Sequence, residues 1–145
     1  SQAVIARLYP WIFSAERNGR SMVAACIGGE LHELGVRMVA DFFEMAGWDS
    51  YFLGANVPAS SLLDAIESRQ ADILGISATM VAHVDAVRQL VAAIRADPRG
   101  ARVRILVGGY PFTLAENLWQ TVGADGFAAD ARGAVGAATK LMCNP

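Results

Sequence analysis

The sequence predicts a doubly wound α/β fold, in which helices cover both faces of a five-stranded parallel sheet. Short apolar runs alternate five times with segments whose apolar residues recur at three- and four-residue spacing, the pattern of strands and amphipathic helices. The third run, residues 72–77, is almost continuously apolar, as the central strands of parallel sheets are. Crossover connections between such strands place helices on both faces of the sheet.

The first strand is expected at residues 22–27 and the first helix at residues 33–46. Gly47 ends this helix as a C′ glycine would. The apolar residues expected to form its buried face are Leu34, Met38, Val39, Phe42 and Met45. Residues 49–53 then form the second strand.

The middle of the chain continues the alternation. Pro58 introduces a second helix, which either Ser60 or Ser61 could cap. Its expected buried residues are Leu62, Leu63 and Ile66. The third strand, residues 72–77, leads into a long helix over residues 81–96. That helix is expected to bury Val84, Val87, Leu90, Val91 and Ile94.

The last part of the chain supplies two more strands, at residues 103–107 and 126–129, and two more helices, at residues 113–122 and 131–142. Five strands favour the flavodoxin-like order 2-1-3-4-5, whose switch point lies between the first and third strands. Ligands of open α/β sheets bind at the carboxyl ends of the strands beside this point. We therefore expect the binding site there.

Three short motifs follow the strands that meet at the switch point. His32 follows the first strand, in what the sequence predicts to be a loop; Ser77 and Thr79 end the third strand, and Gly108 and Gly109 end the fourth. The order of the strands brings these loops to one rim of the sheet. The sequence thus predicts a single site that combines an imidazole, hydroxyl groups and close backbone approach.

Composition excludes several classes of function. The 145 residues suit one domain, and although 54% are hydrophobic, no apolar run reaches the roughly 18 residues that a membrane span requires. A net charge of −2 offers no basic stripe, so direct binding of nucleic acid by this domain is not expected. Two cysteines, Cys26 and Cys143, are too few for a disulfide framework, which favours a reducing cytoplasm.

The three motifs together resemble those of a known family. Residues 30–35, Glu-Leu-His-Glu-Leu-Gly, are similar to an Asp-x-His-x-x-Gly signature, and residues 77–79 to a Ser-x-Leu or Ser-x-Thr signature. With the pair Gly108-Gly109 they match, in order and roughly in spacing, the signatures of the cobalamin (vitamin B12) binding domain. The resemblance covers about residues 21–142.

The resemblance implies a role for each motif. His32 would be the lower axial ligand of the cobalt, in place of the displaced dimethylbenzimidazole, because imidazole is a good nitrogen donor for such a centre. Glu30 would hydrogen-bond the second nitrogen of His32, although a turn carboxylate or a charge at a helix N-terminus is the alternative. Ser77 would bond the benzimidazole, and Thr79 would line the slot that holds the nucleotide tail. Leu31, Glu33, Gly35, Gly108, Gly109 and Tyr110 complete the predicted cofactor-binding set.

Two departures from the family pattern bear on function. Glutamate stands at position 30 in place of aspartate, and Val36 stands where many methyl-transferring members have lysine. The stretch 37–43 looks more like sensory members associated with transcriptional regulators and photoreceptors. The expectation is therefore a sensory or regulatory domain, a binding protein rather than an enzyme, that holds adenosylcobalamin or methylcobalamin.

Two alternatives remain open at this point. One is the corrinoid carrier domain of a methyltransferase, which needs the same His32 site. The other is a haem-binding sensor on the same fold, since imidazole also ligates iron. His83, six residues after Ser77, could face either the site or solvent.

Residues 1–20 are expected to be the tail of an upstream helical segment and a linker, with residues 21–145 as the cobalamin-binding domain. Tyr9, Trp11 and Phe13 would be contacts from a truncated lid. The resemblance implies a helical lid and an output domain upstream, with changes in binding transmitted through the lid or through formation of a homo-oligomer.

Overall fold

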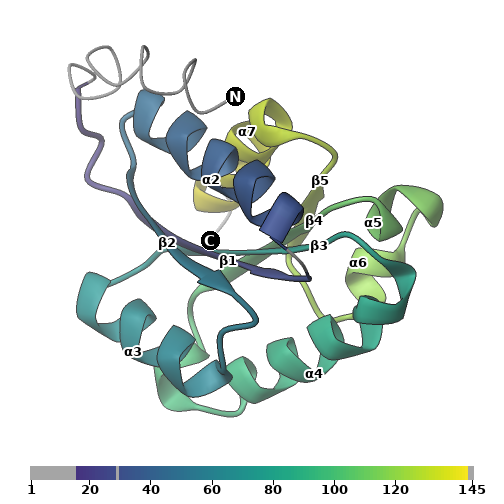
Figure 1. The fold of residues 1–145 in the computed structure, drawn as a ribbon. Helices are drawn as coiled ribbons and strands as arrows, with labels where there is room; N and C mark the ends of the chain where they lie inside the picture. Colours follow the sequence, from purple (N-terminus) through teal and green to yellow (C-terminus); the bar gives the residue numbers. More distant parts are fainter. Residues whose placement is uncertain (1–15, 29, 144–145) are drawn as a thin grey trace.

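A computed structural model describes residues 16–28 and 30–143, and for residues 30–34 it describes the backbone only. Its five strands form one parallel sheet in the order β2-β1-β3-β4-β5, which confirms the predicted fold and order (Figure 1). The strands are β1 (Ser21–Ile27), β2 (Asp49–Ala55), β3 (Ile73–Ala78), β4 (Arg104–Gly108) and β5 (Gly126–Ala128).

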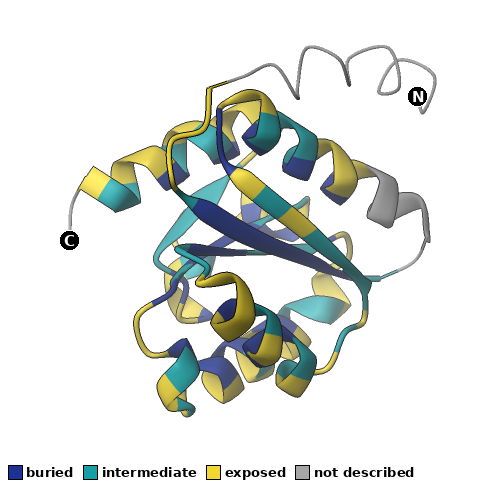
Figure 2. Ribbon diagram, turned by 90° about the vertical axis from the view of Figure 1, so that its left-hand side faces the viewer, coloured by how far each residue is buried: buried dark blue, intermediate teal, exposed yellow. Residues whose placement is uncertain are grey.

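Helices cover both faces of this sheet (Figure 1). One face carries α2 (Glu30–Met45) and α7 (Ala131–Cys143), and the other carries α3 (Ala59–Arg69) and α4 (Val84–Arg95). The short helices α5 (Pro111–Leu114) and α6 (Leu118–Thr121) lie between β4 and β5 in the chain. The three central strands β1, β3 and β4 are mostly buried between these layers, whereas the edge strands β2 and β5 are partly exposed, as are the outer faces of the helices (Figure 2). No helix within the described residues is long and apolar enough to cross a membrane.

The register of the strands brings the predicted motifs level with one another. Cys26 in β1 pairs with Ser77 in β3, and Ser77 pairs with Gly108 in β4. Gly108 in turn pairs with Ala128 in β5. Because all strands are parallel, this row lies at the carboxyl edge of the sheet. The segments that follow β1, β3 and β4 therefore leave the sheet side by side, as the strand order predicts.

Helix α2 turns a different face to the sheet from the one predicted. Its fully buried residues are Val36, Ala40 and Phe43, whereas Met38 and Met45 are 38% and 40% exposed. Both sets have helical spacing, and apolar residues occur around most of this helix. Periodicity alone could not select the correct stripe, because the choice depends on which residues meet the sheet.

Three further details differ from the sequence-based expectation. Helix α3 has Pro58 at its N-cap with no side-chain capping bond, so neither Ser60 nor Ser61 caps it. A 3-10 turn, Val81–His83, precedes α4 in the segment predicted as one helix. The helix predicted over residues 113–122 is divided into α5 and α6, because Ala115 adopts an extended conformation.

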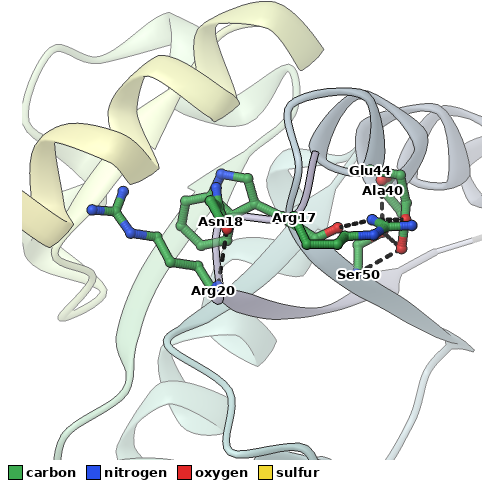
Figure 3. Close-up of polar contacts among 7 residues, drawn as sticks. Arg17, Asn18, Arg20, Ala40, Glu44 and Ser50 are labelled. Carbon is green, nitrogen blue, oxygen red and sulfur yellow. Dashed lines mark hydrogen bonds and ion pairs between the residues drawn. The ribbon is translucent and has the colours of Figure 1, made fainter. Parts of the chain in front are cut away.

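Residues 16–20 pack against the domain at the opposite, amino-terminal edge of the sheet (Figure 3). Arg17 donates to the carboxylate of Glu44 at 2.5 Å and to the carbonyl of Trp48 at 2.9 Å. The N–H of Asn18 donates to the carbonyl of Gly47 at 2.9 Å. These contacts fix the chain just before β1 to the carboxyl end of α2.

The same carboxylate holds the start of β2. Glu44 accepts hydrogen bonds from the backbone N–H and the hydroxyl of Ser50, at 2.9 and 3.2 Å (Figure 3). The Ser50 hydroxyl lies 2.7 Å from the carbonyl oxygen of Ala40. We call residues 16–20 with Glu44, Gly47, Trp48 and Ser50 the linker clamp. Tyr9, Trp11 and Phe13 lie outside the described residues, and the predicted boundary at residue 20 stays a prediction.

Candidate functional site

A cavity of about 260 Å³ lies between the sheet and the helices α2 and α7. Its floor comes from β1, β3 and β4, and α2 and the start of α7 form its walls. Four residues of the predicted site line it, namely Gly35, Ser77, Gly108 and Gly109. Residues from three separate motifs therefore border one cavity, at the edge of the sheet where ligands of such folds bind.

Ser77 reaches this cavity because side chains alternate along a strand. In β3, Leu74 and Ile76 are buried in the core beneath α3 and α4, so Gly75 and Ser77 face α2 and α7. Gly75 also lines the cavity, and a Cβ added to it would lie 3.4 Å from the methyl group of Met22. Gly75 was not among the predicted site residues, although a glycine inside a strand is a signal for close approach of another group.

Glycines keep the cavity open. A Cβ added to Gly35, in α2, would meet no heavy atom within 4 Å, so it would occupy open space at the cavity wall. A Cβ on Gly108 would lie 3.0 Å from the carbonyl oxygen of Ala128. Gly109 has a φ of 108°, which side chains rarely adopt. Side chains at positions 108 and 109 would meet the backbone of Ala128 and Ala78, so glycine is required there by the packing of the sheet, and the two residues line the cavity.

Two predicted residues lie at the edge of the sheet outside the cavity lining. Thr79 is exposed, and its hydroxyl oxygen lies 3.0 Å from the position of a Cβ on Gly28. Tyr110 is 62% exposed and stands at the N-cap of α5. Thr79 does not line this cavity, because it follows the last paired residue of β3 and its hydroxyl lies at the end of β1; its predicted role in binding the cofactor stays a prediction.

The segment that carries His32 begins differently from the prediction. Helix α2 starts at Glu30, so His32 falls within its first turn and not in a loop. Gly28, with a φ of 135°, turns the chain immediately after β1 and leaves little length for a loop. The side chains of Glu30, Leu31, His32 and Glu33 lie outside the described part of the structure.

The rim around the end of β3 and β4 exposes large apolar side chains. Met80 and Val81, which follow β3, are 57% and 60% exposed, and Leu114 in α5 is 56% exposed. Together with Tyr110 they form the apolar rim. Such a concentration of exposed apolar residues at one edge is typical of a surface that a ligand or partner covers.

A parallel sheet with a glycine-lined, largely apolar cavity beside its carboxyl edge defines an α/β domain that binds an organic cofactor. The family follows from the sequence match. Residues 20–138 match the model of the B12 binding domain, so this chain belongs to that family. It is a cobalamin-binding domain. Cobalamin is thus the supported cofactor, and the haem alternative has no support.

Relatives and solved structures agree with this assignment. The chain is 30% identical over 129 residues to dimethylamine corrinoid protein 3 of Methanosarcina acetivorans, covering 88% of this chain and 59% of that protein. A cobalamin-binding protein from Desulfitobacterium hafniense superposes with a TM-score of 0.72 at 29% identity, covering 93% of this chain and 62% of that one. The chain thus spans less than two thirds of the length of these relatives.

A third comparison bears on the fold alone. The monomethylamine corrinoid protein of Methanosarcina barkeri has a TM-score of 0.77 at 20% identity, covering 95% of this chain and 65% of that one.

The relative from Methanosarcina acetivorans is named as a corrinoid protein, not as a sensor, a transcriptional regulator or a photoreceptor. The expected sensory branch therefore has no support from these relatives.

The residues around the cavity fit a cobalamin. The nucleotide tail of the cofactor is elongated and needs a slot into which no side chain projects. The cavity has open space at Gly35, and Gly108 and Gly109 present only backbone to it. Ser77 places a hydroxyl among apolar lining residues, where a hydrogen bond discriminates strongly between ligands. The apolar rim, at the same edge of the sheet, offers exposed apolar surface for the broad face of a corrin.

Proposed function

We propose that this domain is a corrinoid carrier, which holds cobalamin for methyl transfer by partner methyltransferases. The observation that carries the proposal is the glycine-lined cavity directly beneath the edge where the three motifs converge. The relative from Methanosarcina acetivorans, named a dimethylamine corrinoid protein, supports a carrier over the sensory function expected first. When bound, the corrinoid would supply a cobalt centre that can carry a methyl group.

His32 is proposed as the lower axial ligand of the cobalt, with the cofactor base-off. A neutral imidazole nitrogen is a suitable donor, and Glu30 would hold the ring by accepting a hydrogen bond from its other nitrogen. The proposal rests on the position of His32 in the first turn of α2, directly after the turn at Gly28. The N-terminus of a helix also favours the carboxylates of Glu30 and Glu33.

Ser77, Gly35, Gly108 and Gly109 are proposed to hold the nucleotide tail. The Ser77 hydroxyl would hydrogen-bond the displaced benzimidazole, and the glycines would allow the tail to lie against backbone. Thr79 and Tyr110 would contact the corrin at the rim, since both stand outside the cavity. Leu31 is assigned to the same edge by its place in the sequence.

A lid over the upper face of the corrin belongs to the proposal. Met80, Val81, Tyr110 and Leu114 expose apolar surface that a bound corrin and a helical domain would cover together. An upstream helical segment of the full-length protein, or a partner methyltransferase during transfer, would supply that cover. An output domain and a homo-oligomer are the corresponding elements of the sensory alternative.

Reconstitution tests the proposal. The purified chain, incubated with methylcobalamin, should give the absorption spectrum of a base-off, histidine-ligated corrinoid, and His32→Ala should lose the histidine-ligated form. The loaded protein should then release its methyl group when a methylamine methyltransferase system is added. A His32→Ala protein with an unchanged spectrum would exclude the ligand assignment.

One observation favours a sensor as the second candidate. Val36 is buried at 4% exposure and lines the cavity where many methyl-transferring members have lysine. A sensor should change its oligomeric state with light or with the bound corrinoid and should not transfer methyl groups. Light-scattering measurements of the loaded chain, in darkness and after illumination, separate the two candidates.

A further inference from the structure

His83 carries a buried nitrogen that has no hydrogen-bond partner within the described structure. The residue ends the 3-10 turn that leads into α4, where its backbone N–H donates to the carbonyl of Met80 at 2.9 Å. Its Nδ1 atom is inaccessible to solvent and makes no hydrogen bond with residues that the structure describes. A buried polar atom without a partner costs free energy, and such atoms in native proteins call for an explanation.

The ring of His83 lies against the end of β1. Its Nδ1 and Cε1 atoms are both 3.7 Å from the position that a Cβ on Gly28 would take. Two hydrogen bonds with Asn56 fix Gly28, since its N–H donates to the amide oxygen at 3.2 Å and its carbonyl accepts from the amide nitrogen at 3.2 Å. The imidazole therefore packs against a residue that hydrogen bonds hold in place at the end of β1.

The position of His83 relates it to the rim and not to the cavity. Neither His83, Thr79 nor Gly28 lines the cavity proposed for the nucleotide tail. His83 follows Met80 and Val81 of the apolar rim with only Ala82 between them, and its ring lies against the end of β1, the strand that pairs with β3. A corrin carries polar amide side chains around its edge. A corrin bound on this rim would therefore bring hydrogen-bonding groups close to His83.

We propose that His83 is a positioning residue of the corrinoid site, whose Nδ1 gains its hydrogen bond from a polar group at the edge of the bound corrin. This inference rests on the proposed cobalamin site. The last side-chain torsion of histidine has a broad, two-fold profile, and a turn of the ring about this torsion would bring Nδ1 out of its buried position towards the rim. The unloaded protein tolerates the orphaned nitrogen, and the loaded protein uses it.

The proposal predicts that removal of the His83 imidazole keeps or raises the stability of the unloaded protein but weakens its affinity for cobalamin. In His83→Leu the orphaned nitrogen is gone, so the unloaded protein should melt at the same or a higher temperature. Cobalamin should nevertheless bind two- to tenfold more weakly, which is the usual effect of losing one hydrogen bond. A purely structural histidine would instead lower the melting temperature and leave the affinity of the folded protein unchanged.

A matched pair of variants locates the active nitrogen. The amide of His83→Asn lies close to the place of Nδ1, whereas that of His83→Gln reaches the place of Nε2. Asparagine should therefore recover more of the affinity than glutamine. If His83→Leu does not fold, the comparison of Asn with Gln still decides, and equal affinity in both, matching the wild type, would overturn the proposal.

The corrinoid used in the titration separates this proposal from the proposed function. Cobinamide has the corrin and its amide side chains but no nucleotide tail. His83→Leu should weaken cobinamide and cobalamin by the same factor, and a loss confined to cobalamin would overturn the assignment to the corrin edge. Failure of the wild-type chain to bind either corrinoid would instead reject the proposed function. Wild-type binding with unchanged affinity in every His83 variant would reject only the role of His83.

Discussion

The carbonyl oxygen of Ala78 lies 1.8 Å from the point that a Cβ atom on Gly109 would occupy. Ala78 is the last residue of β3 and Gly109 directly follows β4, so this contact closes the sheet just below the rim. No side chain fits at position 109 without moving the backbone, and its φ of 108° adds strain for any residue other than glycine.

Gly109→Ala should therefore lower the free energy of unfolding by more than about 2 kcal/mol, since the clash adds to the cost of the backbone conformation. Urea denaturation of the unloaded chain measures it. Gly136→Ala is the control, because a Cβ on Gly136 in α7 meets no atom within 4 Å. Equal stability of the two variants would show that β3 and β4 can separate locally.

Gly35→Ala and Gly35→Leu should separate stability from binding. Alanine in place of a helical glycine raises the stability of the unloaded chain by roughly 0.5–1 kcal/mol. The longer leucine would fill open space at the cavity wall, so cobalamin should bind much more weakly while the fold is kept. Titrations followed by absorption test this.

Gly136→Ala again serves as the control for Gly35. It should raise stability by a similar amount and leave cobalamin affinity unchanged, because Gly136 does not line the cavity. If Gly35→Leu bound cobalamin as tightly as the wild type, the tail would not lie in this cavity.

Asp41→Asn should stabilise the protein at neutral pH. Partial burial, with Glu44 nearby, raises the pKa of the Asp41 carboxyl above its ordinary value of 3.8, and Arg37 only partly offsets this. A raised folded-state pKa means that the ionised form is disfavoured in the folded protein, so the penalty is present above that pKa and disappears as the pH falls through it. Asparagine removes the penalty.

The expected result for Asp41→Asn is a melting temperature above that of the wild type at pH 7, with the difference shrinking towards pH 3. Thermal unfolding over this pH range measures it. A difference that grows on acidification would mean that the Asp41 carboxylate is stabilised by Arg37 more than it is disfavoured by burial.

Glu44→Ala should loosen the linker clamp. Glu44 accepts hydrogen bonds from Arg17 and from both the N–H and the hydroxyl of Ser50, and its side chain is 17% exposed. Removing an acceptor of several bonds should cost about 1–3 kcal/mol. Asp85→Ala, which breaks the exposed ion pair with Arg88, should cost less than about 1 kcal/mol. Equal losses would show that the clamp is no more than a surface pair.

The sequence was sufficient for the architecture, because each apolar run and its following amphipathic segment has the correct length for a strand and a crossover helix. Strand order followed from the number of strands, and the convergence of Ser77 and Gly108 followed from the order. The periodicity of apolar residues could not predict details that depend on contacts between neighbouring elements. The buried face of α2 is one example, since Val36 and Met38 are equally apolar and only contact with the sheet distinguishes them.

The site shows the same division. Motif spacing placed Gly35, Ser77, Gly108 and Gly109 together, and all four line the cavity. Thr79 was expected in the slot but lies against Gly28, because one residue beyond the end of a strand the alternation of side chains no longer holds. The orientation of His83 depends on packing between a 3-10 turn and β1, which no local pattern in the sequence encodes.

Helix α2 runs without interruption between the cavity and the linker clamp. Its 16 residues contain no proline and form a helix about 24 Å long, which carries both Gly35 of the cavity wall and Glu44 of the linker clamp. Arg17 contacts Glu44 near the carboxyl end of this helix, so a displacement of Arg17 would also act on α2. A tilt of α2 on the sheet would change the distance between Gly35 and Ser77, which both line the cavity.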